Sequence, residues 1–131
     1  MDPTRILIID DDDEPRDSLR ELCELWGHQA ATAVDRDGAL AMAEVFRPDV
    51  VVLDLGLPTL GDGIETACSI RQMCGDRVYV VALTAWARRG DHVQAMKAGC
   101  DVCFQKPFDL RNLHEIVTRA AEQVDAPTRR R

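Results

Sequence analysis

The chain has 131 residues, 46% of them hydrophobic, which suffices for one domain with a sizeable core but not for two. Its net charge of −7 argues against nucleic-acid binding by electrostatics alone, because phosphate backbones attract basic surfaces. The apolar runs are too short to span a membrane and the first residues contain no signal-peptide core, so we expect a cytoplasmic protein.

Apolar, β-branched segments alternate with amphipathic segments along the chain, and this alternation predicts strands followed by helices. The predicted strands cover residues 5–9, 29–33, 50–53, 78–83 and 102–104. The predicted helices cover residues 15–26, 36–46, 64–73, 88–98 and 110–124. Such βα units favour an α/β, doubly wound parallel sheet with helices on both faces. We assign residues 1–124 to this domain and residues 125–131 to a polar tail.

Aspartates follow two of the apolar runs directly. The run Ile6–Ile9 ends in four aspartates, Asp10–Asp13, and the run Val50–Leu53 ends in Asp54. Ligands bind at the carboxyl ends of strands in open α/β sheets, and crowded carboxylates are unfavourable without a cation. These positions therefore predict a site for a hard cation with oxygen ligands, such as Mg²⁺. Within the aspartate run, we expect Asp12 and Asp13 merely to open the following helix.

Two further polar residues stand at the ends of later strands, namely Thr84 and Lys106. A carboxylate can act as a nucleophile toward phosphorus, a hydroxyl can donate to a phosphoryl oxygen, and lysine can neutralise phosphate charge. Phosphoryl transfer depends mostly on positioning and charge neutralisation. Together with the aspartates, these residues indicate phosphoryl chemistry.

Four motifs in order make the chain resemble the receiver domain of two-component response regulators, most closely the single-domain, chemotaxis-regulator-like kind. They are Ile9-Asp10-Asp11, Asp54-Leu55-Gly56-Leu57-Pro58, Ala82-Leu83-Thr84-Ala85 and Lys106-Pro107-Phe108. The resemblance covers roughly residues 4–122. It implies a flavodoxin-like five-stranded sheet in the order 2-1-3-4-5.

The resemblance also implies a metal site. Asp11 and Asp54 would ligate Mg²⁺, or Mn²⁺ in its place, together with the backbone carbonyl of Gly56. Asp10 would act through a metal-bound water. Asp54 would accept a phosphoryl group from a histidine kinase or phosphotransfer protein, as part of a phosphorelay rather than as a turnover enzyme.

After transfer, Thr84 and Lys106 would contact the phosphoryl oxygens. The output would be a change in contacts with a downstream protein through the face formed by the helix at 88–98, the strand at 102–104 and the helix at 110–124. The kinase would dock beside Arg16, Leu19 and Arg20. We expect a monomer or a phosphorylation-dependent dimer that binds neither nucleic acid nor membrane directly. The chain is either a complete regulator or a receiver excised from a longer regulator or hybrid kinase.

Three positions depart from the family pattern. The loop at residues 57–63 is one residue longer than usual, which an exposed loop absorbs easily. Cys103 stands three residues before Lys106, where the family often has an aromatic switch residue, so we expect the usual aromatic coupling to be weakened or replaced. Trp86 stands two residues beyond Thr84, at a position that tends to tune dephosphorylation in the family. We expect its side chain to hinder the approach of water to the phosphoryl group. Its alternative role is packing for stability.

Three other interpretations compete with this one. A haloacid-dehalogenase-type phosphatase needs a second aspartate two residues after the nucleophile, where this chain has Gly56. A phosphorylation-independent scaffold typically lacks the acceptor or the acidic pair. Cys100 and Cys103 form a C-x-x-C pair that invites a zinc or redox interpretation, but no second pair exists, and residues three apart on a strand point to opposite faces.

Overall fold

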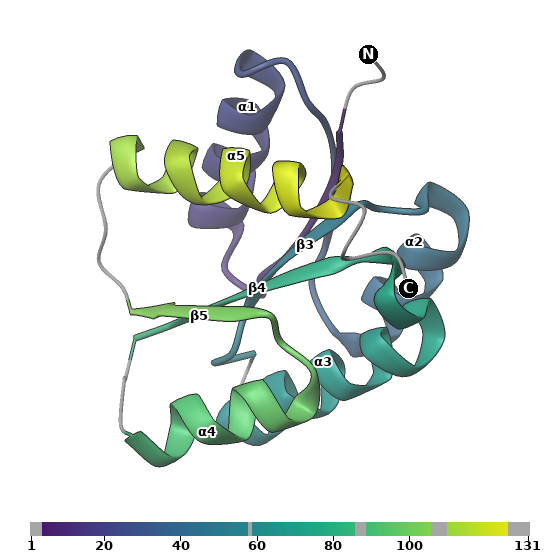
Figure 1. The fold of residues 1–131 in the computed structure, drawn as a ribbon, viewed down its shortest axis with the longest axis vertical. Helices are drawn as coiled ribbons and strands as arrows, with labels where there is room; N and C mark the ends of the chain where they lie inside the picture. The colour runs from purple at the N-terminus through teal and green to yellow at the C-terminus, as the bar shows by residue number, and fades with distance from the viewer. Residues whose placement is uncertain (1–3, 58, 86–88, 106–109, 126–131) are drawn as a thin grey trace.

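Figure 1 shows the computed structural model of the chain, which describes residues 4–57, 59–85, 89–105 and 110–125. Five parallel strands form one sheet in the order β2-β1-β3-β4-β5, as expected. The strands are β1 (Arg5–Ile9), β2 (Gln29–Ala33), β3 (Val50–Asp54), β4 (Tyr79–Thr84) and β5 (Val102–Gln105). The helices are α1 (Asp13–Leu25), α2 (Arg36–Phe46), α3 (Leu60–Cys74), η1 (Gly75–Arg77), α4 (Arg89–Ala98) and α5 (Leu110–Asp125).

The core forms one layer on each face of the sheet. Helices α1 and α5 cover one face, while α2, α3 and α4 cover the other (Figure 1). Side chains alternate along β1 accordingly: Ile6 and Ile8 face α1 and α5, whereas Leu7 and Ile9 face the opposite layer. All four are buried, because a parallel sheet with helices on both faces excludes water from both sides.

The largest difference from the predicted elements is at the start of α3. This helix begins at Leu60, four residues before the predicted boundary at Ile64. Thr59 caps it: its hydroxyl oxygen accepts a hydrogen bond from the Asp62 N–H at 3.3 Å and donates to the Asp62 carboxylate at 2.8 Å. Gly61 and Gly63, which the predicted loop at residues 57–63 includes, therefore lie inside the helix.

Three strands end one residue later than predicted. Strand β3 includes Asp54, β4 runs from Tyr79 to Thr84 rather than from Val78 to Leu83, and β5 includes Gln105. Each of these polar residues is still paired within the sheet. The short helix η1 was not predicted. No helix within the described ranges is both long and apolar enough to cross a membrane.

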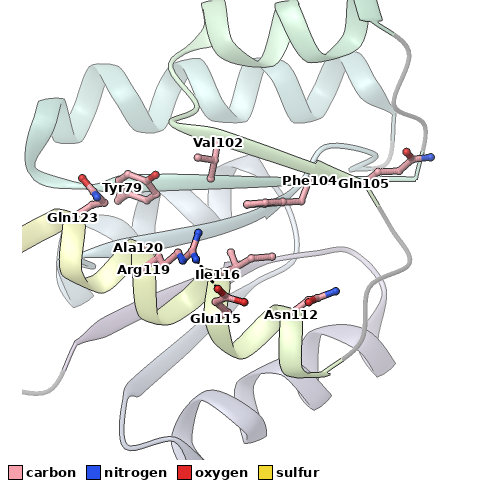
Figure 2. A pocket seen from close by; sticks show the side chains of 10 residues that line it. All are labelled: Tyr79, Val102, Phe104, Gln105, Asn112, Glu115, Ile116, Arg119, Ala120 and Gln123. Atoms are coloured by element: carbon pink, nitrogen blue, oxygen red, sulfur yellow. Dashed lines mark ion pairs between the residues drawn. The ribbon is translucent and has the colours of Figure 1, made fainter.

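A groove of about 590 Å³ lies between α5 and the outer strands of the sheet (Figure 2). Phe104 and Val102 of β5 and Tyr79 of β4 line its apolar side. Glu115 and Arg119, one turn apart on α5, form an ion pair of 2.6 Å along its rim. Phe104 is 36% exposed there. The aromatic ring of β5 thus lies on the α5 side of the sheet.

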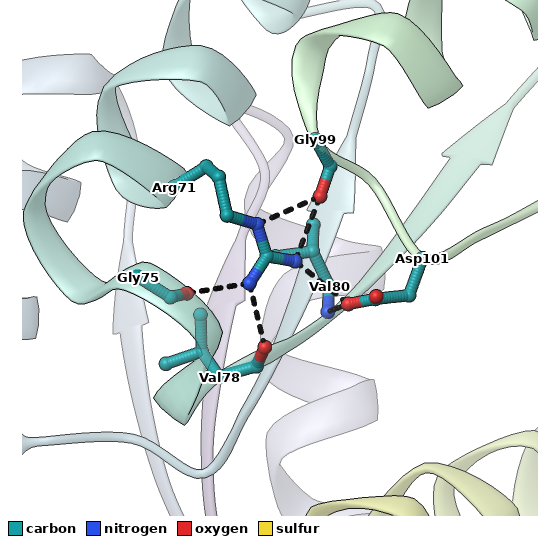
Figure 3. Close-up of polar contacts among 6 residues, drawn as sticks. All are labelled: Arg71, Gly75, Val78, Val80, Gly99 and Asp101. Atoms are coloured by element: carbon teal, nitrogen blue, oxygen red, sulfur yellow. Dashed lines mark hydrogen bonds and ion pairs between the residues drawn. The ribbon is translucent and has the colours of Figure 1, made fainter. Parts of the chain in front are cut away.

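A half-buried arginine joins α3 to the start of β4 and β5 (Figure 3). The Arg71 guanidinium donates to the carbonyls of Gly75, Val78 and Gly99 and lies 2.7 Å from the Asp101 carboxylate. The same Asp101 oxygen accepts the Val80 N–H at 2.7 Å. These bonds fix the amino-terminal edge of the sheet, opposite the edge where the aspartates gather.

Candidate functional site

The carboxyl ends of β1 and β3 bring three of the predicted site residues together. Asp10, Asp11 and Asp54 each offer a carboxylate oxygen, and these oxygens lie within 4.8 Å of one another. Asp10 follows β1 directly and Asp54 is the last residue of β3, the strand paired with β1. The sheet therefore places these carboxylates side by side because adjacent parallel strands end at the same edge.

The three aspartates differ in exposure. Asp10 is buried at 7% exposure, Asp54 is half-buried and Asp11 is exposed. The Asp10 carboxylate accepts the Asp12 N–H at 2.9 Å, and the Asp54 carboxylate accepts the Gly56 N–H at 2.9 Å. Each of these two side chains is thus held by the backbone of the loop that follows its strand. The accessible edge of the cluster is formed by Asp11 and Asp54.

The donor chemistry of this cluster fits a hard divalent cation. Three carboxylates supply oxygen atoms only, which Mg²⁺ and Mn²⁺ prefer over the soft ligands that zinc or copper favours. Like charges at this spacing repel each other, and a cation relieves that repulsion. Exposure of Asp11 leaves room for water ligands, which Mg²⁺ usually retains.

The loop after β3 is fixed on both sides of Gly56. Leu55 and Leu57 are buried, while Gly56 between them is exposed. Helix α3 approaches this loop so closely at Gly63 that a Cβ atom there would lie 1.9 Å from the Leu55 carbonyl oxygen. Only glycine permits this approach. The sequence analysis placed Gly63 in a loop and therefore did not predict that this glycine lets α3 pack directly against Leu55, the residue after Asp54.

Thr84 lies on the strand next to Asp54. In the register of β3 and β4, Asp54 is the partner of Leu83, and Thr84 follows as the last residue of β4. Thr84 is buried at 5% exposure. The sheet thus brings Thr84 to the same edge as the aspartate cluster. The predicted residues Lys106 and Trp86 lie outside the described residues.

The aspartate run divides as expected. Asp12 is the N-cap residue of α1 without a side-chain hydrogen bond to the helix, and Asp13 and Glu14 lie in its first turn. Asp13 pairs with Arg16 at 2.8 Å. Arg16, predicted to lie on the kinase-docking side, turns toward the aspartates, and its side chain is only 11% exposed. The spacing of Asp13 and Arg16, three residues apart on a helix, is the sequence signal for this contact.

The cysteine pair differs from its predicted arrangement. Cys100 lies in the turn before β5 rather than on the strand, so Cys100 and Cys103 contact the same core layer instead of opposite faces. Burial raises the pKa of Cys100 to about 12 and also raises the pKa of Cys103. Both therefore remain protonated thiols at neutral pH, a poor state for metal ligation or redox attack.

Known proteins similar to this chain share the same fold and family. A solved CheY-like receiver domain protein from Methanospirillum hungatei superimposes with a TM-score of 0.87 at 25% identity, covering 95% of this chain and 98% of that chain. The solved receiver domain of NtrX from Brucella abortus reaches 0.80 at 30% identity, covering 89% and 98% of the two chains.

Among curated sequences, the transcriptional regulatory protein PrrA from Mycobacterium tuberculosis is 40% identical over 109 residues, covering 83% of this chain and 46% of that protein. This chain therefore spans about half the length of the curated relatives it matches. The family model described as the response regulator receiver domain matches residues 6–118. This match covers most of the chain, and the chain belongs to the response regulator receiver domain family.

Proposed function

We propose that Asp54 is the phosphoacceptor of this receiver domain and that Asp10, Asp11 and Asp54 form its Mg²⁺ site. The observation that carries the proposal is the convergence of their carboxylate oxygens within 4.8 Å at the carboxyl edge of the sheet. Asp54 combines that position with partial exposure, which a nucleophile needs to reach a phosphoryl donor. Family membership supports the same assignment.

The chain's own groups account for most of the transfer step. A carboxylate oxygen of Asp54 forms a bond to phosphorus while the bond from phosphorus to the donor's nitrogen or oxygen breaks. The Gly56 N–H donates a hydrogen bond to Oδ1 of Asp54, and this bond fixes the orientation of the carboxylate whose other oxygen is the nucleophile. Bound Mg²⁺ would neutralise charge on the carboxylates and phosphoryl oxygens, with the Gly56 carbonyl as a further ligand.

Thr84 and Lys106 complete the proposed site. Thr84 ends the strand next to Asp54, so its hydroxyl is a suitable donor to an added phosphoryl oxygen. Lys106 would supply the positive charge, which its position shortly after β5 supports. Through these contacts the added phosphate would pull on β4 and β5. Assistance to dephosphorylation by the same residues is part of this proposal.

Intact-mass measurement after incubation with Mg²⁺ and acetyl phosphate tests the acceptor. We expect a single phosphoryl adduct in the parent, none without metal and none in Asp54→Asn. An adduct of equal yield in Asp54→Asn refutes the assignment.

A matched pair of variants tests the metal site. Asp11→Asn should slow adduct formation at limiting Mg²⁺, because it removes a carboxylate from the cluster. Its neighbour Asp12→Asn should react like the parent, because Asp12 makes no side-chain bond to the helix it caps and lies outside the cluster. Equal behaviour of the two variants contradicts the proposed division of the aspartate run.

The proposed partners follow from the family. A histidine kinase or phosphotransfer protein would donate the phosphoryl group in the cytoplasm, and a downstream protein would contact α4, β5 and α5. Val93 and Met96 of α4 and Phe104 of β5 are exposed on these elements. Cys103 is half-buried in the core layer to which α4 contributes, and its small thiol stands where the family often has an aromatic ring. We propose that its coupling to α4 differs from that of aromatic-switch members. A pair of structures, with and without beryllofluoride, in which Cys103 and α4 shift as in those members would refute this.

The acceptor function is favoured over the two alternatives. A receiver-like scaffold has no need for three convergent carboxylates, which this chain retains. A haloacid-dehalogenase-type hydrolase would need a general acid two residues after Asp54, and Gly56 offers none. Turnover of a phosphate ester would support the hydrolase instead.

A further inference from the structure

Arg16 is a charged residue whose burial the metal site and the core do not explain. It is the fourth residue of α1, and its side chain is only 11% exposed. Its Nη2 lies 2.8 Å from the Asp13 carboxylate, and its Nε lies 3.4 Å from the Asp17 carboxylate. That Nε is buried without a hydrogen-bond partner among the described residues. Arginine is seldom buried to this extent unless it is paired, and here the ion pairs with Asp13 and Asp17 still leave the Nε without a hydrogen bond.

The remaining contact of Arg16 leads to the metal site. Its Nη1 donates to the backbone carbonyl of Asp10 at 3.4 Å. The Asp10 N–H donates to the Ala33 carbonyl of β2 at 3.1 Å, and the Asp10 carboxylate accepts the Asp12 N–H. The carbonyl of Asp10 is thus held from α1, while its N–H is held from the sheet.

This contact spans the short connection between β1 and α1. Asp10 and Asp11 connect β1 to α1, and the Arg16 N–H also donates to the Asp12 carbonyl at 3.2 Å. Through its backbone and its side chain, Arg16 therefore holds both ends of the short connection that carries two of the three clustered carboxylates. Planar guanidinium groups suit such simultaneous contacts because their donors diverge in a fixed fork.

We propose that Arg16 is a positioning residue for the metal-binding carboxylates. Its guanidinium holds the Asp10 carbonyl against α1 and so keeps Asp10 and Asp11 opposite Asp54. The inference rests on the proposed function of this site as a Mg²⁺ centre. Asp13 and Asp17 already compensate the charge of Arg16, so its contribution is geometric rather than electrostatic.

Two substitutions of Arg16 separate geometry from charge. Arg16→Gln removes a positive charge beside a cation site, so electrostatics alone predicts tighter Mg²⁺ binding. Positioning predicts weaker binding, by about tenfold, as for other residues that support metal ligands from behind. Arg16→Lys keeps the charge and the apolar stem but loses the fork, so positioning predicts a comparable loss while electrostatics predicts none.

The readout is the Mg²⁺ dissociation constant of the full chain, measured by isothermal titration calorimetry without a phosphodonor. Arg20→Gln is the matched control, because Arg20 lies on the same helix and pairs with Glu24 at 2.6 Å, away from the cluster. Its affinity should equal that of the parent. Thermal melts in the absence of Mg²⁺ establish that each variant is folded, and Arg16→Lys carries the test if Arg16→Gln is not.

The outcomes separate this inference from the proposed function. A parent that neither binds Mg²⁺ nor gives an Asp54 adduct overturns the proposed function and this inference with it. A parent that binds Mg²⁺, with Arg16→Gln binding as tightly or more tightly, overturns the positioning role alone. Normal affinity in Arg16→Lys does the same, because it would show that the guanidinium fork is not needed. Weakened binding in both variants supports the proposal.

Discussion

Gly63→Ala is expected to destabilise the protein although alanine is the better helix former. A Cβ at this position in α3 would lie 1.9 Å from the Leu55 carbonyl oxygen and 2.6 Å from the Leu55 Cα. Ordinary contact begins at 3.4 Å, so α3 or the loop after β3 must move by about 1.5 Å. The opposing atoms belong to the backbone of a buried residue and cannot rotate away.

The expected magnitude combines two opposing effects. Overpacking against a fixed neighbour costs up to about 3 kcal/mol, and replacing a helical glycine with alanine returns about 1 kcal/mol. The net loss of about 2 kcal/mol corresponds to a melting temperature lower by roughly 8 °C in a domain of this size. Because Leu55 follows Asp54 directly, the displaced loop should also slow formation of the phosphoryl adduct.

The assay is thermal unfolding followed by circular dichroism, with Gly61→Ala as the matched control. Gly61 lies two residues earlier in the same helix, and a Cβ there meets only the Thr59 hydroxyl oxygen at an ordinary 3.8 Å. Gly61→Ala should therefore raise stability by about half to one kcal/mol. If Gly63→Ala melts at or above the parent temperature, the close approach of α3 to Leu55 is not a real constraint and the reasoning fails.

The other predictions concern the amino-terminal edge, a histidine and the thiols. Asp101→Asn should lower the urea-unfolding free energy by about 2 kcal/mol, because it weakens charge-assisted bonds to Arg71; an unchanged urea midpoint would contradict this. Burial, followed by the charge of His114, lowers the pKa of His28, so stability should be full above its unfolded value of 6.5 and decline as the pH falls below it. In melts between about pH 5 and pH 7, which bracket the usual histidine pKa, His28→Gln should reduce the dependence of the melting temperature on pH. A pH dependence equal to the parent's would refute the assignment. With Ellman's reagent, the exposed Cys68 should give the fast reaction of the native protein and the phase should vanish in Cys68→Ser, whereas Cys23, buried with a pKa of about 12, should react only on unfolding.

Much of the fold was predictable because its signals are local. Strands β1, β3 and β4 are short β-branched runs that both helix layers bury, so their apolar pattern located them within a residue. The edge strand β2 was located as well, although it is rich in alanine and mostly half-buried. The start of α3 was not predictable in this way. Gly61 and Gly63 read locally as turn residues, but the Thr59 cap and the contact with Leu55 make the same residues helical.

The cysteine pair shows the same limit. Period-two alternation places Cys100 and Cys103 on opposite faces only if both belong to one strand. Strand β5 begins at Val102, so Cys100 lies in the preceding turn and reaches the same core layer. The start of β5 was itself predicted correctly; the alternation rule failed because it was applied to Cys100, which lies outside the strand.

The sequence by itself determined the aspartates at the ends of β1 and β3, because buried runs followed by charged residues reveal strand ends without any tertiary information. It could also divide the aspartate run, since Asp12 and Asp13 follow the rules of a helix start. Only the tertiary structure decided that Arg16 turns back to the Asp10 carbonyl and that α3 packs closely against Leu55 at Gly63. Both contacts cross from one element to another, and their geometry depends on where the sheet places the two elements rather than on the residues between them.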